Sequence, residues 1–506
     1  MTDTQAKNIL VLNMGMKSIR SIIFRPDGEK LAYAARPLET QLDADIVVQS
    51  PEEWWTKACA VVRESLIDVG RESIGAITVT TSSSCLVYVD ADGRALDKCL
   101  MVSDKRGLME QAKVAAVFGA QASACPMLGK MLWVQQHQPE NFAQTAKFLA
   151  PNDYLLARMT GRYVTDVFDA VKCGYDASRA CYPEEKLQQL GFCSAQLPDV
   201  QPVGSVVGPL TQEAADALSL LPETQAVLTT YDAICSFFGS GVAEEGEASD
   251  VSGTVTVFRA FSRRTDLRPN PDIFLMPYPE QRMTIVGGSN NLGGGLIEWV
   301  KQCYYQKESY PYEVMEKDAG EARLGADGLV FLPYLLGERA PIWNPEARGV
   351  FFGLERMHTR KEMTRAVFES AGFIDFDMIR AIEATGMEVR RIRLSGGLAR
   401  IRLISELKAD ITGRDVEVLE EFETTSTGAA MLALVGLGVF PDLRAAAGAF
   451  ATVRMVIRPN AARHQKYLRL FELYKRTYHA LEGLFHERMD LVRQLNPKHE
   501  VRIENL

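Results

Sequence analysis

The chain has 506 residues, of which 47% are hydrophobic and 24% are charged. This ordinary composition and length predict a folded protein with roughly two to four domains. The formal net charge of -9 at pH 7 argues against a nucleic-acid partner, because binding to a phosphate backbone needs an excess of basic groups. No apolar run approaches the ~18 residues of a membrane span and the first residues lack a signal-peptide pattern, so we expect no membrane partner and a cytoplasmic location.

Cysteine and histidine usage predicts reduced thiols rather than disulfides or a zinc site. The nine cysteines are odd in number and include no Cys-x-x-Cys pair, and the six histidines are scattered. This pattern is typical of buried, reduced cysteines. We therefore expect any metal ion to be held by oxygen ligands.

The first predicted element is a β-hairpin. Apolar residues alternate over Asn8–Asn13 and a second strand-like run covers Ile19–Phe24, with Gly15 in the turn between them. A helix is expected over Pro51–Val69, because proline is favoured in the first turn of a helix. A strand is expected over Ile74–Thr81, which is rich in β-branched residues. This alternation of strands and helices predicts an α/β fold.

A second hairpin with a similar small-residue bend is predicted near the middle of the chain. Its strands are Ala248–Val251 and Val255–Phe261, and its bend is Ser252-Gly253-Thr254. Two similar openings predict two α/β halves, as after a duplication. The charged, periodic C-terminal residues are expected to form a packing helix or pair of helices. The predicted organisation is an N-terminal domain over 1–247, a C-terminal domain over 248–460 and a helical tail over 461–506.

Common nucleotide-binding and hydrolase motifs are absent from the sequence. It has no G-x-x-x-x-G-K-[S/T], no G-x-G-x-x-G that opens a helix and no G-x-S-x-G, which disfavours P-loop ATPases, dinucleotide oxidoreductases and serine hydrolases. Glycine-containing bends remain, and such bends can cradle a polyphosphate, although one bend alone is more often just a turn. These bends are Gly15 with Ser18, Ser252-Gly253-Thr254, Gly293-Gly294-Gly295 and Ser395-Gly396-Gly397.

The segment from Gly325 to Glu369 carries the strongest motif. It contains LPYLLGERAPIWNPEARG, then GVFFGL and HTRKEMTRAVFE, and it closely resembles the signature of the FGGY carbohydrate kinases. The resemblance extends over almost the whole chain. Further similar segments are the opening hairpin, the Ser252-Gly253-Thr254 bend, GKMLW (129–133), NDYLLARMTGRYVTD (152–166), TTYDA (229–233), LSGGLAR (394–400) and TGAAMLA (427–433).

The resemblance implies an α/β fold with two domains of the actin and hexokinase (ribonuclease H-like) type and a catalytic cleft between them. It also implies ATP and Mg²⁺ as cofactors. The implied substrate is a small sugar, ketose or polyol that is phosphorylated on a hydroxyl group. Phosphoryl transfer suits this arrangement because it needs positioning, charge neutralisation and exclusion of water. A homodimer is expected from the general frequency of symmetric oligomers.

Asp232, in TTYDA, falls where the general base of the family lies. A carboxylate within hydrogen-bond reach of a sugar hydroxyl can orient that hydroxyl and accept its proton. Without the resemblance, an aspartate after a β-branched run is better explained as a helix N-cap. With it, we expect Asp232 to be the catalytic base, to contact the substrate and to lie near the metal.

The resemblance also assigns residues to ATP and its phosphates. Arg20 looks like a phosphate-contacting basic residue, and Gly253 with Thr254 resembles a second phosphate loop. Gly396 with Gly397 looks like the turn on the adenosine side. Without the resemblance, the two charged members of the set would be interpreted as surface charges. The expected nucleotide- or phosphate-binding residues are Gly15, Ser18, Arg20, Gly253, Thr254, Gly294, Glu298, Gly396 and Gly397.

The sequence departs from the family in the first hairpin. The family opens with D-x-G-T, whereas this chain has Asn13 and Met16 at the two functional positions. Asn13 keeps an oxygen that could orient a magnesium-bound water but loses the charge, and Met16 has no hydroxyl to donate. The metal would then rely on Asp232 and the phosphates.

The sugar-side loops also depart from the family. Ser82-Ser83-Ser84-Cys85 stands where xylulokinases carry Q-M-H-G and glycerol kinases carry an R-E pair. The W-x-D-x-R element of the family keeps its aspartate and arginine but not its tryptophan. Although the serines alone would simply end a strand, the resemblance makes them substrate contacts in a branch distinct from both subfamilies. The expected sugar-side residues are Ser83, Ser84, Asp104, Arg106 and Asp232.

Two function classes remain open. The leading interpretation is an ATP-dependent kinase, and the alternative is a catalytically impaired sugar or nucleotide sensor that keeps the fold, suggested by Asn13 and Met16. Retention of Asp232 and of the glycine bends favours the enzyme. An actin-like filament or chaperone ATPase is disfavoured, because the FGGY signature belongs to the sugar kinases.

Overall fold

The structure is a computed structural model that describes residues 7–253, 255–291 and 293–495. In it the chain divides into two structural units, and the first change of unit falls between Gly241 and Val242. Unit 1 runs to Gly241 and also includes Tyr278–Arg282 and Thr424–Ala451. Unit 2 comprises Val242–Pro277, Met283–Glu423 and the residues from Thr452 onward.

The predicted first hairpin is confirmed and forms the middle of the sheet of unit 1. β1 (Asn8–Met14) and β2 (Ser18–Phe24) pair antiparallel. On its other side β1 pairs in parallel with β6 (Ile74–Thr81), the predicted strand, and β6 pairs in parallel with β13 (Gln225–Val227). The six-stranded order is β12-β13-β6-β1-β2-β3. Its two edge strands are β3 (Lys30–Pro37) and β12 (Val206–Pro209).

The sheet of unit 2 repeats this plan. The second predicted hairpin is confirmed as β14 (Glu247–Ser252) and β15 (Thr256–Ser262), which pair antiparallel. β14 also pairs in parallel with β20 (Arg391–Ser395), as β1 does with β6. The seven-stranded order is β16-β17-β15-β14-β20-β21-β22. Its other strands are β16 (Phe274–Tyr278), β17 (Met283–Ser289), β21 (Asp415–Leu419) and β22 (Val453–Ile457).

Helices and smaller strands complete unit 1. The helix predicted over Pro51–Val69 is α1 (Pro51–Ser65), which ends earlier because the following residues turn toward Gly70, at a φ of 78°. The other strands are β4 (Gln41–Asp43), β5 (Ile46–Gln49), β7 (Val87–Val89), β8 (Cys99–Leu100), β9 (Lys147–Leu149), β10 (Val164–Thr165) and β11 (Asp199–Val200). The other helices before residue 242 are α2 (Gln111–Phe118), α3 (Pro126–His137), α4 (Pro139–Gln144), α5 (Pro151–Thr160), α6 (Val167–Ala170), α7 (Glu184–Gln189), α8 (Gln212–Leu218) and α9 (Asp232–Gly239).

Unit 2 is completed by helices and a two-stranded antiparallel sheet. The predicted C-terminal helix is confirmed as a single helix, α16 (Ala461–Leu495), which packs on the rest of the unit: Tyr474 Oη bonds Tyr334 Oη at 2.6 Å. The remaining elements are α10 (Gly294–Tyr304), α11 (Pro311–Glu321), β18 (Val330–Leu332), β19 (Val350–Phe352), α12 (Arg360–Ala384) and α13 (Arg402–Thr412). Within the described ranges, no helix is long and apolar enough to cross a membrane.

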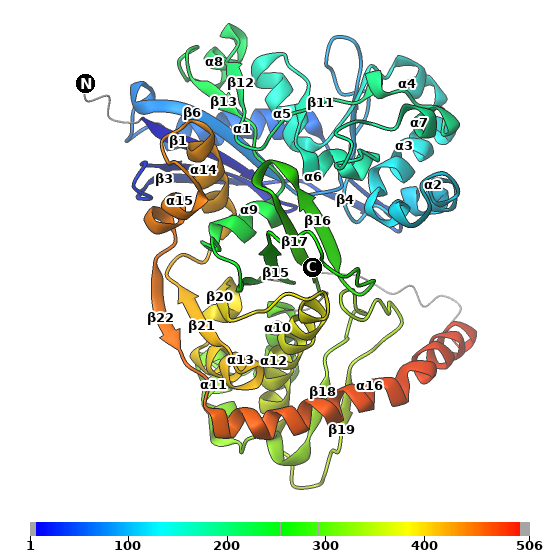
Figure 1. Ribbon diagram of the computed structural model, residues 1–506, viewed down its shortest axis with the longest axis vertical. Helices are drawn as coiled ribbons and strands as arrows, with labels where there is room; N and C mark the ends of the chain where they lie inside the picture. Colours follow the sequence, from blue (N-terminus) through cyan, green and yellow to red (C-terminus); the bar gives the residue numbers. More distant parts are fainter. Residues whose placement is uncertain (1–6, 254, 292, 496–506) are drawn as a thin grey trace. The chain divides into compact units, whose positions relative to one another are not determined.

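Two late helices return to unit 1, which differs from the predicted contiguous domain over 248–460. They are α14 (Thr424–Gly436) and α15 (Leu443–Phe450), drawn in orange beside the blue strands of unit 1 (Figure 1). The sequence of α14 is apolar all around, which suits a helix buried on several sides. Its sides contact β1, β6 and α9, so the domain boundaries cannot follow the chain order.

Two glycines allow α14 and α9 to cross at backbone contact. A Cβ on Gly428 would lie 1.8 Å from Cys235 O, and a Cβ on Gly239 would lie 1.9 Å from Thr424 O. Neither position can therefore carry a side chain without moving a helix. Since α9 begins with Asp232, this crossing also fixes where that helix lies in unit 1.

Replacing Gly428 by alanine should destabilise the protein by about 3 kcal/mol, because the methyl group overlaps the backbone carbonyl of Cys235 where α14 crosses α9. Urea unfolding of the purified variants measures this change. Gly448→Ala on α15 is the matched control: no described atom lies within 4 Å of its added Cβ, so helix propensity should stabilise it by up to about 1 kcal/mol. Equal stabilities of the two variants would contradict the crossing.

Candidate active site

Several predicted site residues of unit 1 lie at one edge of its sheet. Gly15 follows β1, Ser83 and Ser84 follow β6, and Asp232 lies a short loop beyond β13. The three strands are parallel neighbours in the order β13-β6-β1, so the residues that follow them emerge at the same edge. Ligands of open α/β sheets bind at the carboxyl ends of the strands. Unit 1 therefore brings the predicted base, the sugar-side serines and the first bend to one region.

Asp232 stands at the start of α9 on a firmly held loop. The N-cap is Tyr231 and not Asp232, whose Oδ1 accepts from the next backbone N–H at 2.7 Å. Thr80 Oγ1 of β6 donates to Thr230 O at 2.9 Å. Thr230 Oγ1 donates to Asp166 Oδ1 at 3.0 Å. The backbone that presents the half-buried Asp232 is thus held by two buried neighbours.

Three buried carboxyl groups lie behind this loop, and sequence reasoning missed them. They are Asp153, Asp166 and Asp169, each at most 2% exposed. Asp166 caps α6 by accepting from Phe168 N at 2.8 Å. Burial, reinforced by charges within the group, raises the pKa of Asp153 and Asp166 well above the usual range, and burial also raises the pKa of Asp169. Two of the three lie in the segment 152–166 that carried the resemblance, but a motif does not report burial.

Asn13 and Arg20 oppose each other across the first hairpin. They are direct partners in the β1–β2 pair, and opposed residues share a face of the sheet. Asn13 is buried and donates from Nδ2 to Ser426 Oγ of α14 at 3.0 Å. Arg20 Nε donates to Ser18 Oγ at 3.2 Å, beside the bend. The amide at Asn13 thus joins β1 to α14, a bond that an aspartate could not donate.

A buried lysine that sequence reasoning did not single out joins the two sugar-side loops. Lys130, on α3, is 3% exposed, and its Nζ donates to Ser84 O at 2.6 Å and to Met101 O. Ser84 has a φ of 58°, in the left-handed region that costs a non-glycine residue energy. Burial lowers the pKa of Lys130. Its bonds to both loops fix their backbones relative to each other.

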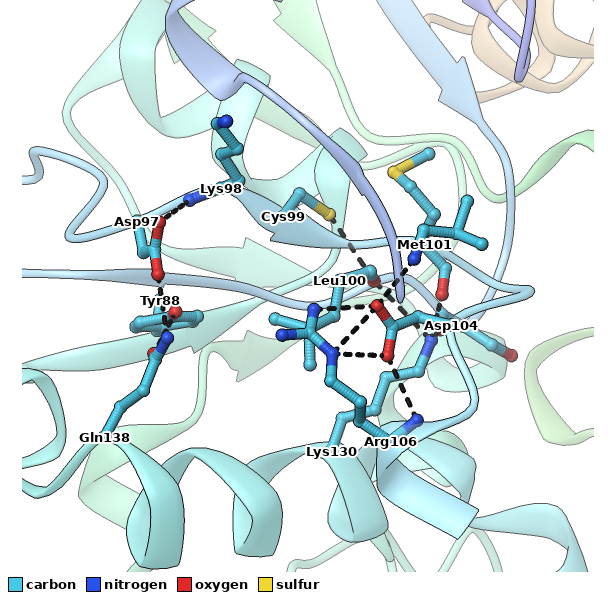
Figure 2. A network of polar contacts seen from close by, with 12 residues as sticks. Tyr88, Asp97, Lys98, Cys99, Leu100, Met101, Asp104, Arg106, Lys130 and Gln138 are labelled. Carbon is cyan, nitrogen blue, oxygen red and sulfur yellow. Dashed lines mark hydrogen bonds and ion pairs between the residues drawn. The ribbon is translucent and has the colours of Figure 1, made fainter. Parts of the chain in front are cut away.

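Asp104 and Arg106 form a bidentate ion pair in the second of these loops. Arg106 Nη2 lies 2.7 Å from Asp104 Oδ2, and the Asp104 side chain is fully buried. Asp104 Oδ2 also accepts from Val47 N at 3.0 Å. The guanidinium of Arg106 lies over the ring of Trp133 at 4.3 Å. Both residues are therefore held rigidly, and both carboxylate oxygens of Asp104 accept hydrogen bonds from groups of this chain (Figure 2).

Predicted nucleotide-side residues of unit 2 also meet at one edge of a sheet. Gly253 follows β14 and Gly396 follows β20, and these strands are parallel neighbours. Gly294 N, at the start of α10, donates to Gly253 O at 2.6 Å. Gly396 has a φ of 84°, and a Cβ there would lie 2.5 Å from Ser252 O. Thr254 lies outside the described residues.

The predicted glycines fall into two kinds. A Cβ on Gly294 or Gly396 would meet the chain itself, at Gly253 O and Ser252 O. At Gly15, Gly253 and Gly397 φ lies outside the left-handed region and no described atom lies closer than 3.7 Å to an added Cβ. The fold therefore explains the first kind of glycine, while the second kind leaves open space beside the backbone.

Glu298 lies one helical turn after Gly294, and its side chain is paired with other residues at the surface. Its carboxylate binds Lys301 and accepts from Tyr312 Oη. Burial raises the pKa of Glu298, but these two partners outweigh burial and hold it below its usual value. The side chain is 45% exposed, so in this arrangement it is a paired surface carboxylate.

Family models match most of the chain. The N-terminal domain model of the FGGY family of carbohydrate kinases matches residues 8–239, and the C-terminal domain model matches residues 248–437. Among curated proteins, the xylulose kinase of Bacillus subtilis is 27% identical over 93% of this chain and 97% of its own length. The gluconokinase of the same organism is 26% identical over 85% of this chain and 88% of its own length.

Solved structures match the fold over nearly the full length. A ligand-bound xylulose kinase from Lactobacillus acidophilus gives a TM-score of 0.88 at 25% identity, covering 95% of this chain and 99% of that one. The gluconate kinase from the same organism gives a TM-score of 0.87 with the same identity and coverage. These matches confirm the predicted two-domain α/β fold of the actin and hexokinase type, and matches to enzymes favour the kinase over the sensor. The chain therefore belongs to the FGGY family of carbohydrate kinases and is a carbohydrate kinase.

Proposed function

We propose that this kinase transfers the γ-phosphoryl group of ATP to a hydroxyl of a small sugar, ketose or polyol, with Asp232 as the general base. The observation that carries the proposal is the position of Asp232 at the carboxyl edge of β13, on a loop held by Thr80 and Asp166. Asp232 accepts the hydroxyl proton while the oxygen attacks phosphorus, and the bond to ADP breaks. A rigid loop favours this step because the carboxylate needs no rearrangement to meet the hydroxyl.

The open glycines support a role in holding phosphates. At Gly15 and Gly253 a side chain would fit the fold, so their missing Cβ atoms serve close approach to the backbone from outside. We assign Gly15, Ser18 and Arg20 to the transferred phosphate, and Gly253 with Gly294 to the phosphates of the nucleotide. Gly396 and Gly397 would lie on the adenosine side. Thr254 and Glu298 keep their assignments as predictions only.

The residues present fit a Mg²⁺ ion that is carried mainly by ATP. Among residues 7–253, 255–291 and 293–495, no group of three or more His, Cys, Asp or Glu side chains is arranged to hold a metal. Mg²⁺ commonly uses one or two carboxylates together with phosphates and waters. Asp232 would supply the carboxylate and Asn13 could contact a bound water. When bound, Mg²⁺ neutralises charge on the phosphates.

The sugar-side loops set the choice of substrate. Xylulose and gluconate are the substrates named for the relatives, so both belong in the first panel, with other ketoses, polyols and sugar acids. Ser83 and Ser84 carry short hydroxyl side chains, and the paired Arg106 lies in the loop that Lys130 joins to theirs. The homodimer and the cytoplasmic location stay predictions from the sequence.

Asp232→Asn should lower kcat by about 10²- to 10⁴-fold, because the amide cannot accept the hydroxyl proton. ADP release with MgATP and the best substrate of the panel measures the loss. Asp216→Asn on the exposed surface of α8 is the control and should keep full activity. A kcat within twofold of the wild type would remove Asp232 from the role of base.

Asn13→Asp should give no gain in kcat and should lower stability by about 1–3 kcal/mol. The Ser426 hydroxyl can donate to the new carboxylate in place of accepting from the amide, so the cost comes from placing a charge in a buried position. Asn8→Asp, at the start of the same strand, is the control and should change neither quantity. A severalfold gain in kcat would instead mean that the wild-type asparagine weakens a site built for a carboxylate.

Lys130→Met should raise KM for the sugar by about tenfold while KM for ATP stays near its wild-type value, because the loops that carry Ser84 and Arg106 lose their common anchor. Steady-state kinetics with each substrate varied in turn separates the two constants. Lys147→Met is the control, since Lys147 also donates to a carbonyl, that of Leu197 at 2.8 Å, but serves neither loop. An equal rise of both KM values would contradict a role specific to the sugar side.

A further inference from the structure

A buried cluster of charges lies under the second hairpin. Lys408 on α13 is 1% exposed, and its Nζ donates to Asp250 of β14 and, at 2.6 Å, to Asp375 Oδ2 of α12. The side chains of Asp250 and Asp375 are also at most 1% exposed. These three residues, here called the buried triad, tie the first strand of the hairpin to two helices.

The triad occupies positions where the pattern of the chain calls for apolar residues. Side chains two apart along a strand share a face, so Asp250 lies on the same face as Ala248, which belongs to an apolar cluster. Asp375 lies on one helix stripe with Ile379, and Lys408 lies on one stripe with Ile404. Each of the three charged residues thus occupies a core position of its helix or strand, where an apolar residue would be expected.

Such a cluster is costly for the fold. Asp375 Oδ1 is buried and has no hydrogen-bond partner among the described residues. Burial, then the charge of Asp250, raises the pKa of Asp375 well above its usual value. Replacing a buried ion cluster by apolar residues of similar volume is often neutral or stabilising. Stability alone therefore gives little reason for the triad.

The triad reaches the hairpin bend through one hydroxyl. Ser252 Oγ donates to Asp250 Oδ1 at 2.6 Å and accepts from Lys408 Nζ at 3.2 Å. Ser252 directly precedes Gly253, and its carbonyl lies against Gly396 of the neighbouring turn. The orientation of Ser252 is thus set by two charged groups, together with Thr256 Oγ1 at 3.2 Å, at the point where the Gly253 bend and the Gly396 turn meet.

We propose that Lys408, Asp250 and Asp375 are positioning residues that hold the Ser252–Gly253 bend for the phosphates of the nucleotide. They act through Ser252 and touch no ligand themselves. This inference rests on the proposed function, since it takes the bend to be a phosphate site.

The test replaces the whole triad with apolar residues in the full-length chain. The variant carries Asp250→Val, Asp375→Leu and Lys408→Met, which should keep or raise the melting temperature. Its affinity for the ATP analogue AMP-PNP with Mg²⁺, measured by titration calorimetry, should fall about tenfold, as expected when a contacting backbone segment is misplaced. Calorimetry needs no sugar substrate, so the readout is independent of turnover.

A matched control replaces a second, partly buried ion pair on the same helix. Asp377 of α12 lies two residues beyond Asp375 and pairs with Lys475 of α16 at 2.7 Å. Residues two apart on a helix do not share a face, so this pair lies on another side of α12 than the triad. The variant with Asp377→Leu and Lys475→Met should bind AMP-PNP within twofold of the wild type. Equal losses in both variants, or no loss in the triad variant, would overturn the inference.

A single substitution decides the outcome if the triad variant does not fold. Ser252→Ala keeps the ion pairs and removes the hydroxyl that links them to the bend and also bonds Thr256. It should weaken AMP-PNP binding by about threefold, and unchanged affinity would overturn the inference. A wild-type chain that binds no AMP-PNP would instead overturn the proposed function and this inference together.

Discussion

Parallel pairing of one hairpin strand with its neighbour is the constraint on which both units depend. β1 pairs with β6 and β14 pairs with β20, each in parallel, while the other side of β1 and β14 is taken by the antiparallel partner of the hairpin. The hairpin bend therefore stands at the same edge as the loops that leave the parallel strands. Residues far apart in sequence, such as Gly15 and Asp232, reach one region through backbone pairing alone.

A buried lysine binds residues near the loop edge of each sheet, but the two lysines bind different kinds of group. Lys130 donates to backbone carbonyls, so it fixes two loops whatever side chains they carry, and burial lowers its pKa. Lys408 donates to two carboxylates, which outweigh burial and raise its pKa. The first arrangement leaves the side chains of both loops free to vary, whereas the second contacts the particular side chain of Ser252.

Local patterns predicted the parts of the fold that local physics decides. Both hairpins, the strand β6 and the helix α16 follow from alternation or helical periodicity within one segment. The return of α14 to unit 1 could not be predicted, because its crossing with α9 depends on contacts between Gly428 and Cys235, far apart in the chain. The buried roles of Lys130 and Lys408 could not be predicted from the sequence for the same reason. A lysine is read from sequence as exposed, and only the packed neighbours reveal the partners that keep it buried.

The predicted site glycines differ in the reason why glycine is present. Gly396 has a left-handed φ and no room for a Cβ, so the fold alone requires glycine there. Gly15 and Gly253 have neither restriction. Where the native conformation suits other residues, glycine costs about 0.4–1 kcal/mol of stability relative to alanine through the entropy of the unfolded chain. Our proposal that phosphate groups approach the backbone at these two bends would account for this cost, because successive backbone N–H groups at a bend can bind an anion.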